Sequence, residues 1–370
     1  MKIAITGGNG FIAKNLFVRL KELKDVEVAI ICRDTSIEER NETILAADFI
    51  FHLAGVNRPK DTQEYQVGNV DLTREICDVL FNAGRNTSIL VSSSSQAESD
   101  NDYGSSKLKA ENEVRNYGLK TKAAVYICRL PNVFGKWSRP NYNSVVATFC
   151  HNISRNIPIV VNDPAAILRL VYIDDVVDIF LGVLSGNLPE TEFLDVSPVY
   201  ETTVGNVAKI LKKLAESRYT LTTPPVGLGL MRALHSTYLS HLPPASFAYE
   251  VPKHSDSRGV FVEMLKTETS GQFSYFTAFP GITRGGHYHH TKTEKFLVIQ
   301  GKAHFKFRHI VTNEINEIIT TGHEALIVET VPGWAHDITN IGEELMIVLL
   351  WANEIFDREN PDTIGSKVIL

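Results

Sequence analysis

The spacing of apolar residues changes once along this chain, near residue 248, and this change constrains the fold more than any other feature. Before it, short apolar runs alternate with segments whose apolar residues recur at helical spacing; after it, short apolar runs follow one another across turns. The first pattern is typical of a parallel sheet covered by helices, the second of an all-β sandwich or barrel. A chain of 370 residues can hold two domains. We predict an α/β domain over residues 1–243 and an all-β domain over residues 244–370.

The first half contains the strand–helix alternation itself. Five apolar runs are predicted to be buried strands: residues 2–6, 26–32, 48–55, 87–93 and 123–130. Three segments are predicted helices: residues 13–24, 71–84 and 201–218. The stretch 221–244 holds four prolines and two glycines around a short apolar piece, and we interpret it as the connection between the domains. In the second half the predicted strands are residues 259–265, 273–279, 295–301, 303–311, 324–330 and 344–351.

Charge and cysteine content exclude some classes of function. The net charge is −6 and no basic run occurs, so we expect no nucleic-acid partner and no membrane-surface role. No apolar stretch is long enough to cross a bilayer, and the N-terminus begins as a strand and not as a signal peptide. The cysteines lie far apart in the first half: Cys32, Cys77, Cys128 and Cys150. This spacing is typical of reduced thiols, and we expect a cytoplasmic protein.

A glycine-rich loop follows the first predicted strand. Gly7, Gly8 and Gly10 precede a predicted helix, and Ala13 stands where a small residue lets the helix pack on the strand. Glycine allows a tight turn and lets the backbone approach a pyrophosphate, which the N–H groups of the helix N-terminus then bind. The agreement of strand, loop and helix favours a dinucleotide site over an ordinary turn.

The end of the second predicted strand bears on the choice between NADPH and NADH. Many NAD-binding folds place an acidic residue there to bind the ribose 2′-hydroxyl. Here Cys32 is followed by Arg33, whose guanidinium can pair with the 2′-phosphate of NADPH. We therefore predict NADPH, although Asp34 leaves NAD open.

Tyr103 and Lys107 carry the predicted acid–base chemistry. A spacing of four residues places both on one face of a helix. A neighbouring ammonium favours the phenolate, and we expect Lys107 to bring the pKa of Tyr103 into a useful range. Ser94, or alternatively Ser93, lies at the end of the preceding strand and can donate a hydrogen bond to a substrate carbonyl.

The ordered set of glycine loop, HLAG at 52–55, strand-end serines and Tyr-x-x-x-Lys resembles the extended short-chain dehydrogenase/reductase family over residues 1–240. The resemblance implies that Tyr103 is the general acid, Lys107 lowers its pKa and Ser94 orients the carbonyl. The spacing from Ser94 to Tyr103 is shorter than in many members, and Arg169 replaces an arginine that often precedes the segment 171–177. The implied cofactor-binding residues are Gly7, Gly10, Phe11, Ile12, Arg33, Leu53, Ala54 and Lys107.

A second constellation lies in the all-β half. His287, His289 and Glu294 form a His-x-His motif followed by a glutamate, and His336 lies in a later Pro-Gly-x-x-His segment. Residues two apart in a strand face the same side, so His287 and His289 should point inward together. Three imidazoles and a carboxylate suit Zn²⁺, which we predict, and also Fe²⁺, Mn²⁺ or Ni²⁺.

These two motifs resemble the two-part signature of the cupins, over about residues 248–370. Some cupins lack the metal, so a metal-free pocket is the alternative. The segments 256–263 and 281–289 resemble cupins that epimerise nucleotide-linked 4-keto-6-deoxysugars. That resemblance implies proton removal beside a ketone, with His287, His289, His336 or Tyr288 as candidates to move the proton. A histidine that binds a metal is not free to act as a base. We expect His290 to face outward.

The order of the two parts resembles a family of bifunctional enzymes of capsular polysaccharide synthesis. By that resemblance, the substrate is a UDP-linked 2-acetamido-2,6-dideoxy-4-hexulose, a 4-keto-6-deoxy-N-acetylhexosamine. The cupin would epimerise C3, and the reductase would reduce C4 to give UDP-2-acetamido-2,6-dideoxy-L-talose, toward N-acetyl-L-fucosamine. The resemblance also implies a homodimer. The alternatives are a reductase with a metal-stabilised cupin for dimerisation, a nucleotide-sugar-binding regulator, and an oxidative iron cupin.

Overall fold

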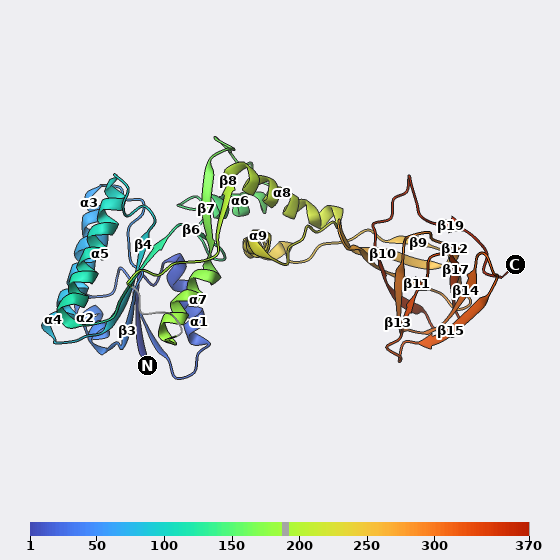
Figure 1. Ribbon diagram of the computed structural model, residues 1–370, viewed down its shortest axis with the longest axis horizontal. Coiled ribbons are helices and arrows are strands. Elements are labelled where there is room, and N and C mark those ends of the chain that lie inside the picture. The colour runs from blue at the N-terminus through green and yellow to red at the C-terminus, as the bar shows by residue number, and fades with distance from the viewer. Residues whose placement is uncertain (187–191, 370) are drawn as a thin grey trace. The chain divides into compact units, whose positions relative to one another are not determined.

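The computed structural model describes residues 1–186 and 192–369, which form two compact units (Figure 1). The first unit comprises Met1–Lys212 and Leu228–Pro243, and the second comprises Lys213–Gly227 and Pro244–Leu370. The chain therefore enters the second unit at Lys213, returns to the first unit at Leu228, and enters the second unit again at Pro244.

A five-stranded parallel sheet is the centre of the first unit, in the order β2-β1-β3-β4-β5. The strands are β1 (Lys2–Thr6), β2 (Glu27–Ile31), β3 (Phe49–His52), β4 (Ser88–Ser94) and β5 (Val125–Leu130). All four residues of β3 are buried, because helices cover both faces of the sheet. The predicted parallel α/β sheet is confirmed, and each predicted strand overlaps an observed one.

Helices cover the two faces of this sheet (Figure 1). On one face pack α1 (Phe11–Lys21) and α7 (Ile173–Leu184), and on the other pack α2 (Ile37–Ala46), α4 (Leu72–Asn82) and α5 (Asp102–Thr121). The short α3 (Gln63–Tyr65) and the π-helix η1 (Gln66–Asp71) lead into α4. Helix α5 begins after Asn101, whose side chain accepts a hydrogen bond from the backbone N–H of Gly104.

A smaller three-stranded sheet and further helices complete the first unit. Its strands are β6 (Asn132–Phe134), β7 (Ile167–Tyr172) and β8 (Val199–Thr203), and the helices are α6 (Val145–Ile153), α8 (Val204–Thr220) and α9 (Gly229–Ser240). Helix α8 continues into the second unit. The interpretation of residues 221–244 as a connection is wrong for α9, which buries Ala233, Leu234 and Tyr238 within the first unit. The flanking prolines and glycines mark its ends.

The second unit consists of two antiparallel sheets, as the sequence predicts for an all-β region. Their orders are β16-β13-β18-β11-β10-β9 and β15-β14-β17-β12-β19. The strands are β9 (His254–Asp256), β10 (Gly259–Thr267), β11 (Gly271–Ala278), β12 (Thr283–Tyr288), β13 (Glu294–Gln300), β14 (Lys302–His309), β15 (Ile315–Thr321), β16 (Ile327–Glu329), β17 (Trp334–Asn340), β18 (Met346–Ala352) and β19 (Ile364–Gly365). A short 3₁₀ turn, η2 (Pro244–Ser246), precedes them.

Alternating side chains of these strands form the core of the second unit. Along β18 the residues alternate between buried and half-buried, which matches one face packed on the core. Phe276 and Phe296 from one sheet meet Phe305, Phe307 and Ile338 from the other. The segment 221–223 also belongs to this unit, since its backbone bonds to that of Lys266 in β10.

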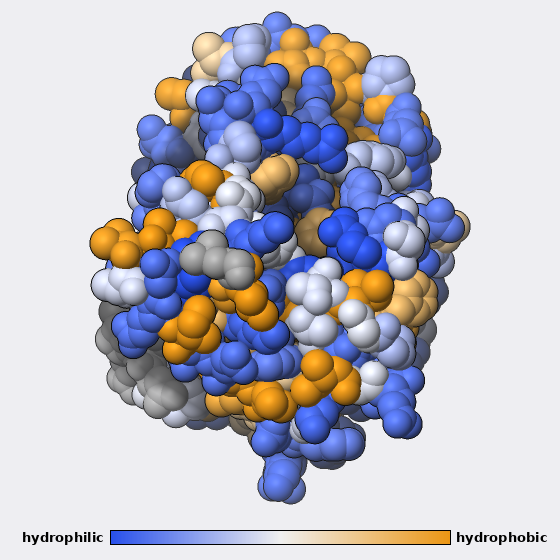
Figure 2. Space-filling view, turned by 90° about the vertical axis from the view of Figure 1, so that its right-hand side faces the viewer, coloured by the Kyte–Doolittle hydropathy of each residue, from blue (hydrophilic) through white to orange (hydrophobic). Residues whose placement is uncertain are grey.

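The surface offers no large apolar field on the face drawn in Figure 2, where hydrophobic groups among the coloured residues are small and separated by hydrophilic ones. In the part of the chain that the structure describes, no helix combines the length and apolar character needed to span a membrane. The four cysteines are free thiols.

Candidate functional site

The candidate active site of the first unit is a cavity of about 1320 Å³. It lies beyond the carboxyl ends of the parallel strands, where doubly wound α/β folds bind their ligands. Its lining includes eight of the predicted residues: Gly10, Phe11, Ile12, Arg33, Leu53, Ser94, Tyr103 and Lys107.

The glycine loop forms one wall of this cavity. The N–H of Gly10 donates to the carbonyl of Gly7 at 2.8 Å, which closes a tight turn, and Gly7 has a positive φ of 71°. A Cβ at Gly7 would lie 2.7 Å from the backbone of Ala54. Gly7 and Ala54 therefore support the loop from behind and do not line the cavity. Helix α1 begins at Phe11 without a side-chain cap, so its first N–H groups remain available for a phosphate.

Tyr103 and Lys107 lie on the first turns of α5 and both line the cavity. Lys107 is buried, and its ammonium donates to the carbonyl of Ser92 at 2.7 Å. Burial lowers the pKa of Lys107 to about 8, while the carboxylate of Glu111 opposes this shift. Burial raises the pKa of Tyr103, and a hydrogen bond with Ser94 opposes that change. This direction is opposite to the one expected from the lysine neighbour, and it leaves Tyr103 a neutral phenol able to donate a proton.

The two candidate serines have different partners. The Ser94 hydroxyl accepts a hydrogen bond from the N–H of Gln96 at 3.1 Å and lowers the pKa of Tyr103, whereas Ser93 donates to the carboxylate of Glu111. Arg129 donates a hydrogen bond to the same carboxylate, with its Nη2 2.7 Å from one of the oxygens. Both serines line the cavity, but the hydroxyl of Ser93 is bound to Glu111, so Ser94 is the serine available beside the phenol.

Positive charge surrounds the cavity. Arg33, Arg58, Lys107 and Arg139 line it, and among the described lining residues there is no aspartate or glutamate. This lining suits ligands that carry phosphates. Sequence reasoning missed Arg58 and Arg139, because both lie on irregular loops without a motif. Arg169, the predicted substitute arginine, is exposed on β7 outside this lining.

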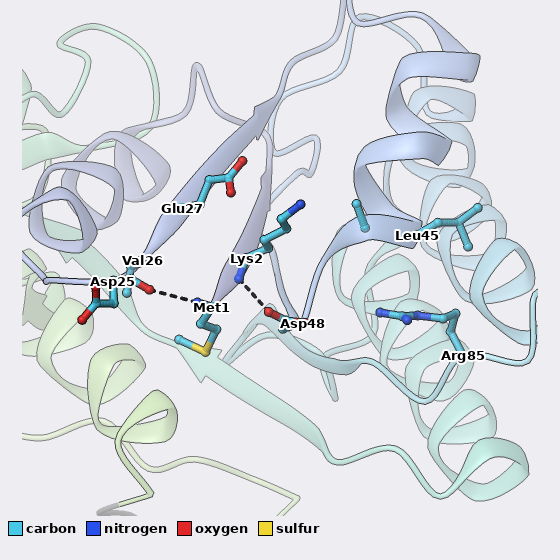
Figure 3. A pocket seen from close by; sticks show the side chains of 9 residues that line it. Met1, Lys2, Asp25, Val26, Glu27, Leu45, Asp48 and Arg85 are labelled. Atoms are coloured by element: carbon cyan, nitrogen blue, oxygen red, sulfur yellow. Dashed lines mark hydrogen bonds between the residues drawn. The ribbon is translucent and has the colours of Figure 1, made fainter.

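A second hollow, of about 780 Å³, lies at the opposite, amino-terminal edge of the sheet (Figure 3). Two of its polar groups have partners: the Met1 ammonium donates to the carbonyl of Asp25, and the N–H of Lys2 donates to Asp48 at 2.7 Å. Charges of both signs line it, so we do not consider it a ligand site.

The second unit brings together all four predicted metal ligands. His287 lies on β12, His289 just beyond it, Glu294 at the start of β13 and His336 on β17. One potential ligand atom of each lies within 4.8 Å of all the others. Glu294 Oε2 is 3.5 Å from Nε2 of His289 and 3.5 Å from Nε2 of His336. These separations are long for hydrogen bonds, but ligand atoms of one tetrahedral zinc lie roughly 3.3 Å apart.

Burial and unpaired atoms support the fit of a metal to this cluster. Nε2 of His289 and both ring nitrogens of His336 are buried and have no hydrogen-bond partner. Burial, followed by the neighbouring His336, lowers the pKa of His287 to about 4, which leaves the neutral imidazole that a metal requires. Burial opposes ionisation of Glu294, but contacts with His289, His336 and Lys292 outweigh it and hold the pKa of that carboxyl well below its usual range.

Other side chains near the cluster also have defined places. His290 is exposed and packs its ring against that of Tyr288. The Lys292 ammonium lies 2.9 Å from Oε1 of Glu294, a contact that the motif-based reasoning missed. The position of Lys292, two residues before the predicted ligand Glu294, could have indicated this contact from the sequence.

Comparison with known proteins agrees with the geometry of the first unit. A model of the NAD dependent epimerase/dehydratase family matches residues 3–192, which is more than half of the chain. The chain belongs to this family. A second match, to the polysaccharide biosynthesis C-terminal domain, covers residues 254–364.

Two similar proteins align over the whole chain. The UDP-2-acetamido-2,6-beta-L-arabino-hexul-4-ose reductase of Pseudomonas aeruginosa strain PA103 is 57% identical, covering 100% of this chain and 99% of that protein. The crystal structure of the capsular polysaccharide assembling protein CapF from Staphylococcus aureus has a TM-score of 0.93 at 42% identity, with both chains covered in full. The UDP-glucuronic acid 4-epimerase of Bacillus cereus shares the fold over 65% of this chain and 98% of its own, with a TM-score of 0.56 at 17% identity.

The resemblance to enzymes of capsular polysaccharide synthesis, of which CapF is one, and the α/β-then-β architecture are thus confirmed. The chain is an enzyme of a nicotinamide-dependent family.

Proposed function

We propose that this protein is a bifunctional nucleotide-sugar enzyme. Its α/β domain, residues 1–243, reduces the C4 ketone of a UDP-linked 2-acetamido-2,6-dideoxy-4-hexulose with NADPH. Its cupin domain, residues 244–370, first inverts C3 of the same sugar. The product is UDP-2-acetamido-2,6-dideoxy-L-talose, toward N-acetyl-L-fucosamine for a capsular polysaccharide. Support comes from the 57%-identical Pseudomonas relative, named as a 4-keto sugar reductase, and from the CapF relative.

The observation that carries the reductase proposal is that Ser94, Tyr103 and buried Lys107 line the same cavity. A bound NADPH supplies a hydride to C4. Tyr103 donates its proton to the ketone oxygen, so that the C=O bond becomes a hydroxyl. Ser94 orients that oxygen, and the Lys107 ammonium stabilises the phenolate left on Tyr103. Arg33 binds the 2′-phosphate, and Arg58 and Arg139 supply charge for the UDP diphosphate.

The four-ligand cluster carries the epimerase proposal. His287, His289, Glu294 and His336 would hold a Zn²⁺ ion, whose positive charge would favour ionisation of a proton beside the ketone. Histidine ligands are not free to move that proton, and Tyr288 alternates with them along the chain and packs its ring against exposed His290, so we assign no base.

Deuterium incorporation into the substrate tests the two activities separately. The protein is incubated with the UDP-linked 4-keto sugar in D₂O without nicotinamide, and the C3 proton is followed by NMR. Loss of that signal supports the epimerase, and its persistence alongside NADPH oxidation would leave a reductase alone.

Two variants then assign the activities to their units. Tyr103→Phe should abolish NADPH oxidation and leave exchange at C3 intact, because only the reductase needs the phenol. His336→Ala should do the reverse. Loss of both activities in either folded variant would contradict the separation.

A second candidate function keeps only the reductase and makes the cupin a metal-stabilised dimerisation module. The name of the Pseudomonas relative, which states a reductase and no epimerase, favours it. It predicts no C3 exchange, and loss of the homodimer when zinc is removed, measured by sedimentation.

A further inference from the structure

The C-terminal segment, residues 354–369, contacts both sides of the proposed metal site, and we call it the C-terminal strap. Its strand β19 pairs with β12 where Gly365 lies opposite His287. The strap is fixed at this end, because the N–H of Ser366 donates to the carbonyl of Gly286 at 2.9 Å. Arg308 on β14 donates to the carbonyl of Lys367 at 2.8 Å and to the Ser366 hydroxyl.

Asp362, within the strap, holds the turn that connects two of the metal ligands. The turn runs from His289 to Glu294, between β12 and β13. The Asp362 carboxylate accepts hydrogen bonds from the consecutive backbone N–H groups of His290, Thr291 and Lys292, at 2.9, 2.7 and 2.8 Å. These bonds hold the pKa of Asp362 well below its usual range. A carboxylate that accepts three backbone donors fixes the conformation of the turn.

The backbone of Asp362 also fixes the ring of His289. Nδ1 of His289 contacts the Asp362 carbonyl oxygen, which can only accept a hydrogen bond. Nδ1 therefore carries a proton, and Nε2 is the ring nitrogen that can offer a lone pair to a metal. Nε2 is the buried atom without a partner, 3.5 Å from Glu294 Oε2.

On the other side of the cluster, Lys292 contacts both the proposed metal ligand Glu294 and the strap residue Phe356. The Lys292 ammonium is bound to Oε1 of Glu294, which leaves Oε2 directed at His289 and His336. It also lies 5.6 Å from the ring centre of Phe356, a residue of the strap.

We infer that Asp362 is the positioning residue of the metal site, because it fixes both the 289–294 turn and the tautomer of His289 that leaves Nε2 free for a metal. This inference rests on the metal site proposed above. Partners that orient a metal-binding histidine commonly change metal affinity 10- to 100-fold when they are removed.

Zinc affinity of the full-length protein tests the inference. Zn²⁺ is titrated against a competing chromophoric chelator for the unchanged protein, Asp362→Ala, Asp362→Asn and Asp357→Ala. Both Asp362 variants keep the backbone carbonyl beside His289 and change only the carboxylate that holds the turn. We therefore expect roughly 10-fold weaker binding for Asp362→Ala and a smaller loss for the isosteric asparagine, which keeps one accepting oxygen. Asp357→Ala is the matched control, since among residues 1–186 and 192–369 the one hydrogen-bond partner of that exposed aspartate is the nearby N–H of Glu359. It should bind zinc as the unchanged protein does.

The rise in melting temperature on addition of Zn²⁺ gives a second readout and shows whether each variant is folded. If Asp362→Ala does not fold, Asp362→Asn decides the question. Equal zinc affinity in the Asp362 variants and the unchanged protein would overturn the inference while leaving the metal site in place. Equal weakening by Asp357→Ala would also overturn it. No zinc binding by the unchanged protein would remove the metal site itself.

Discussion

Lys107 and Glu111 together set the pH range of the proposed reduction. Burial lowers the pKa of Lys107 to about 8, and the Glu111 carboxylate partly restores it. The ammonium is present below that pH and lost above it, so kcat/KM for NADPH-dependent reduction should fall above about pH 8. Glu111→Gln removes the restoring charge and should move this fall downward by roughly one pH unit.

Rate profiles measured from pH 6 to 10 check this expectation. Glu113→Gln is the control, because Glu113 lies on the same helix but pairs with Arg74. An alkaline limb that stays in place in Glu111→Gln would show that Lys107 does not govern it.

In the proposed function, Arg33 gives the preference for NADPH by pairing with its 2′-phosphate. Loss of its charge-assisted bond to the 2′-phosphate should raise the KM for NADPH roughly 10- to 100-fold and leave that for NADH almost unchanged. Steady-state kinetics of Arg33→Ala with both cofactors measure the difference. Arg19→Ala, on α1 and outside the cavity lining, serves as the control. An equal change with both cofactors would argue against this role.

Single residues also show where the sequence was insufficient. Ser93 and Ser94 occupy equivalent places at a strand end, and only their partners on α5 distinguish them. In the same way, Asp362 lies about 70 positions from the turn that it holds. Motif spacing reports local chemistry, whereas these roles depend on contacts between distant segments.

At the level of elements, the turn between β1 and α1 tolerates no side chain at Gly7. Gly7→Ala combines a left-handed conformation with a Cβ 2.7 Å from the Ala54 backbone. We expect it to lower the free energy of unfolding by about 2 kcal/mol or more and to weaken NADPH binding.

Gly84→Ala separates the cost of the left-handed conformation from the cost of the close contact. Gly84 has a similar φ of 66° but nothing within 4 Å of the position that a Cβ would take. The substitution should cost about 1 kcal/mol, the conformational part alone, in urea unfolding. Equal costs for the two variants would show that the close approach to Ala54 is unimportant.

Elements with strong periodicity were predicted well from the sequence. The five parallel strands and six of the eleven described strands of the second unit lie where apolar runs indicated; β9, β12, β15, β17 and β19 were not among the predicted runs. Helix α9 was missed, because prolines and glycines on both sides of residues 229–240 resemble a linker and its packing on α6 is a tertiary property.

At the scale of the whole molecule, the second unit includes residues 213–227, which precede α9 in the chain. The N–H of Thr223 donates to the carbonyl of Lys266 at 2.8 Å, the N–H of Lys266 donates to that of Leu221, and the Leu221 side chain is buried. A fragment of residues 213–370 should therefore be more stable than one of residues 244–370.

The difference should be about 3 kcal/mol, or roughly 10 °C in melting temperature by circular dichroism. Identical melting would show that the 221–223 segment adds nothing. The domain boundary predicted from the change in apolar pattern assigns residues 221–223 to the first domain, because three residues are too few to show a periodicity.

The cavity lined by arginines and a lysine, with no acidic group among its described lining residues, also has a kinetic meaning. Both proposed ligands are polyanions, and such a lining attracts them from solution before any specific contact forms. Added salt shortens the range of this attraction to about 8 Å near physiological ionic strength. Capture of the sugar nucleotide should thus slow with increasing salt while turnover of the bound substrate does not, and abundant cellular nucleotides would compete for the same entrance.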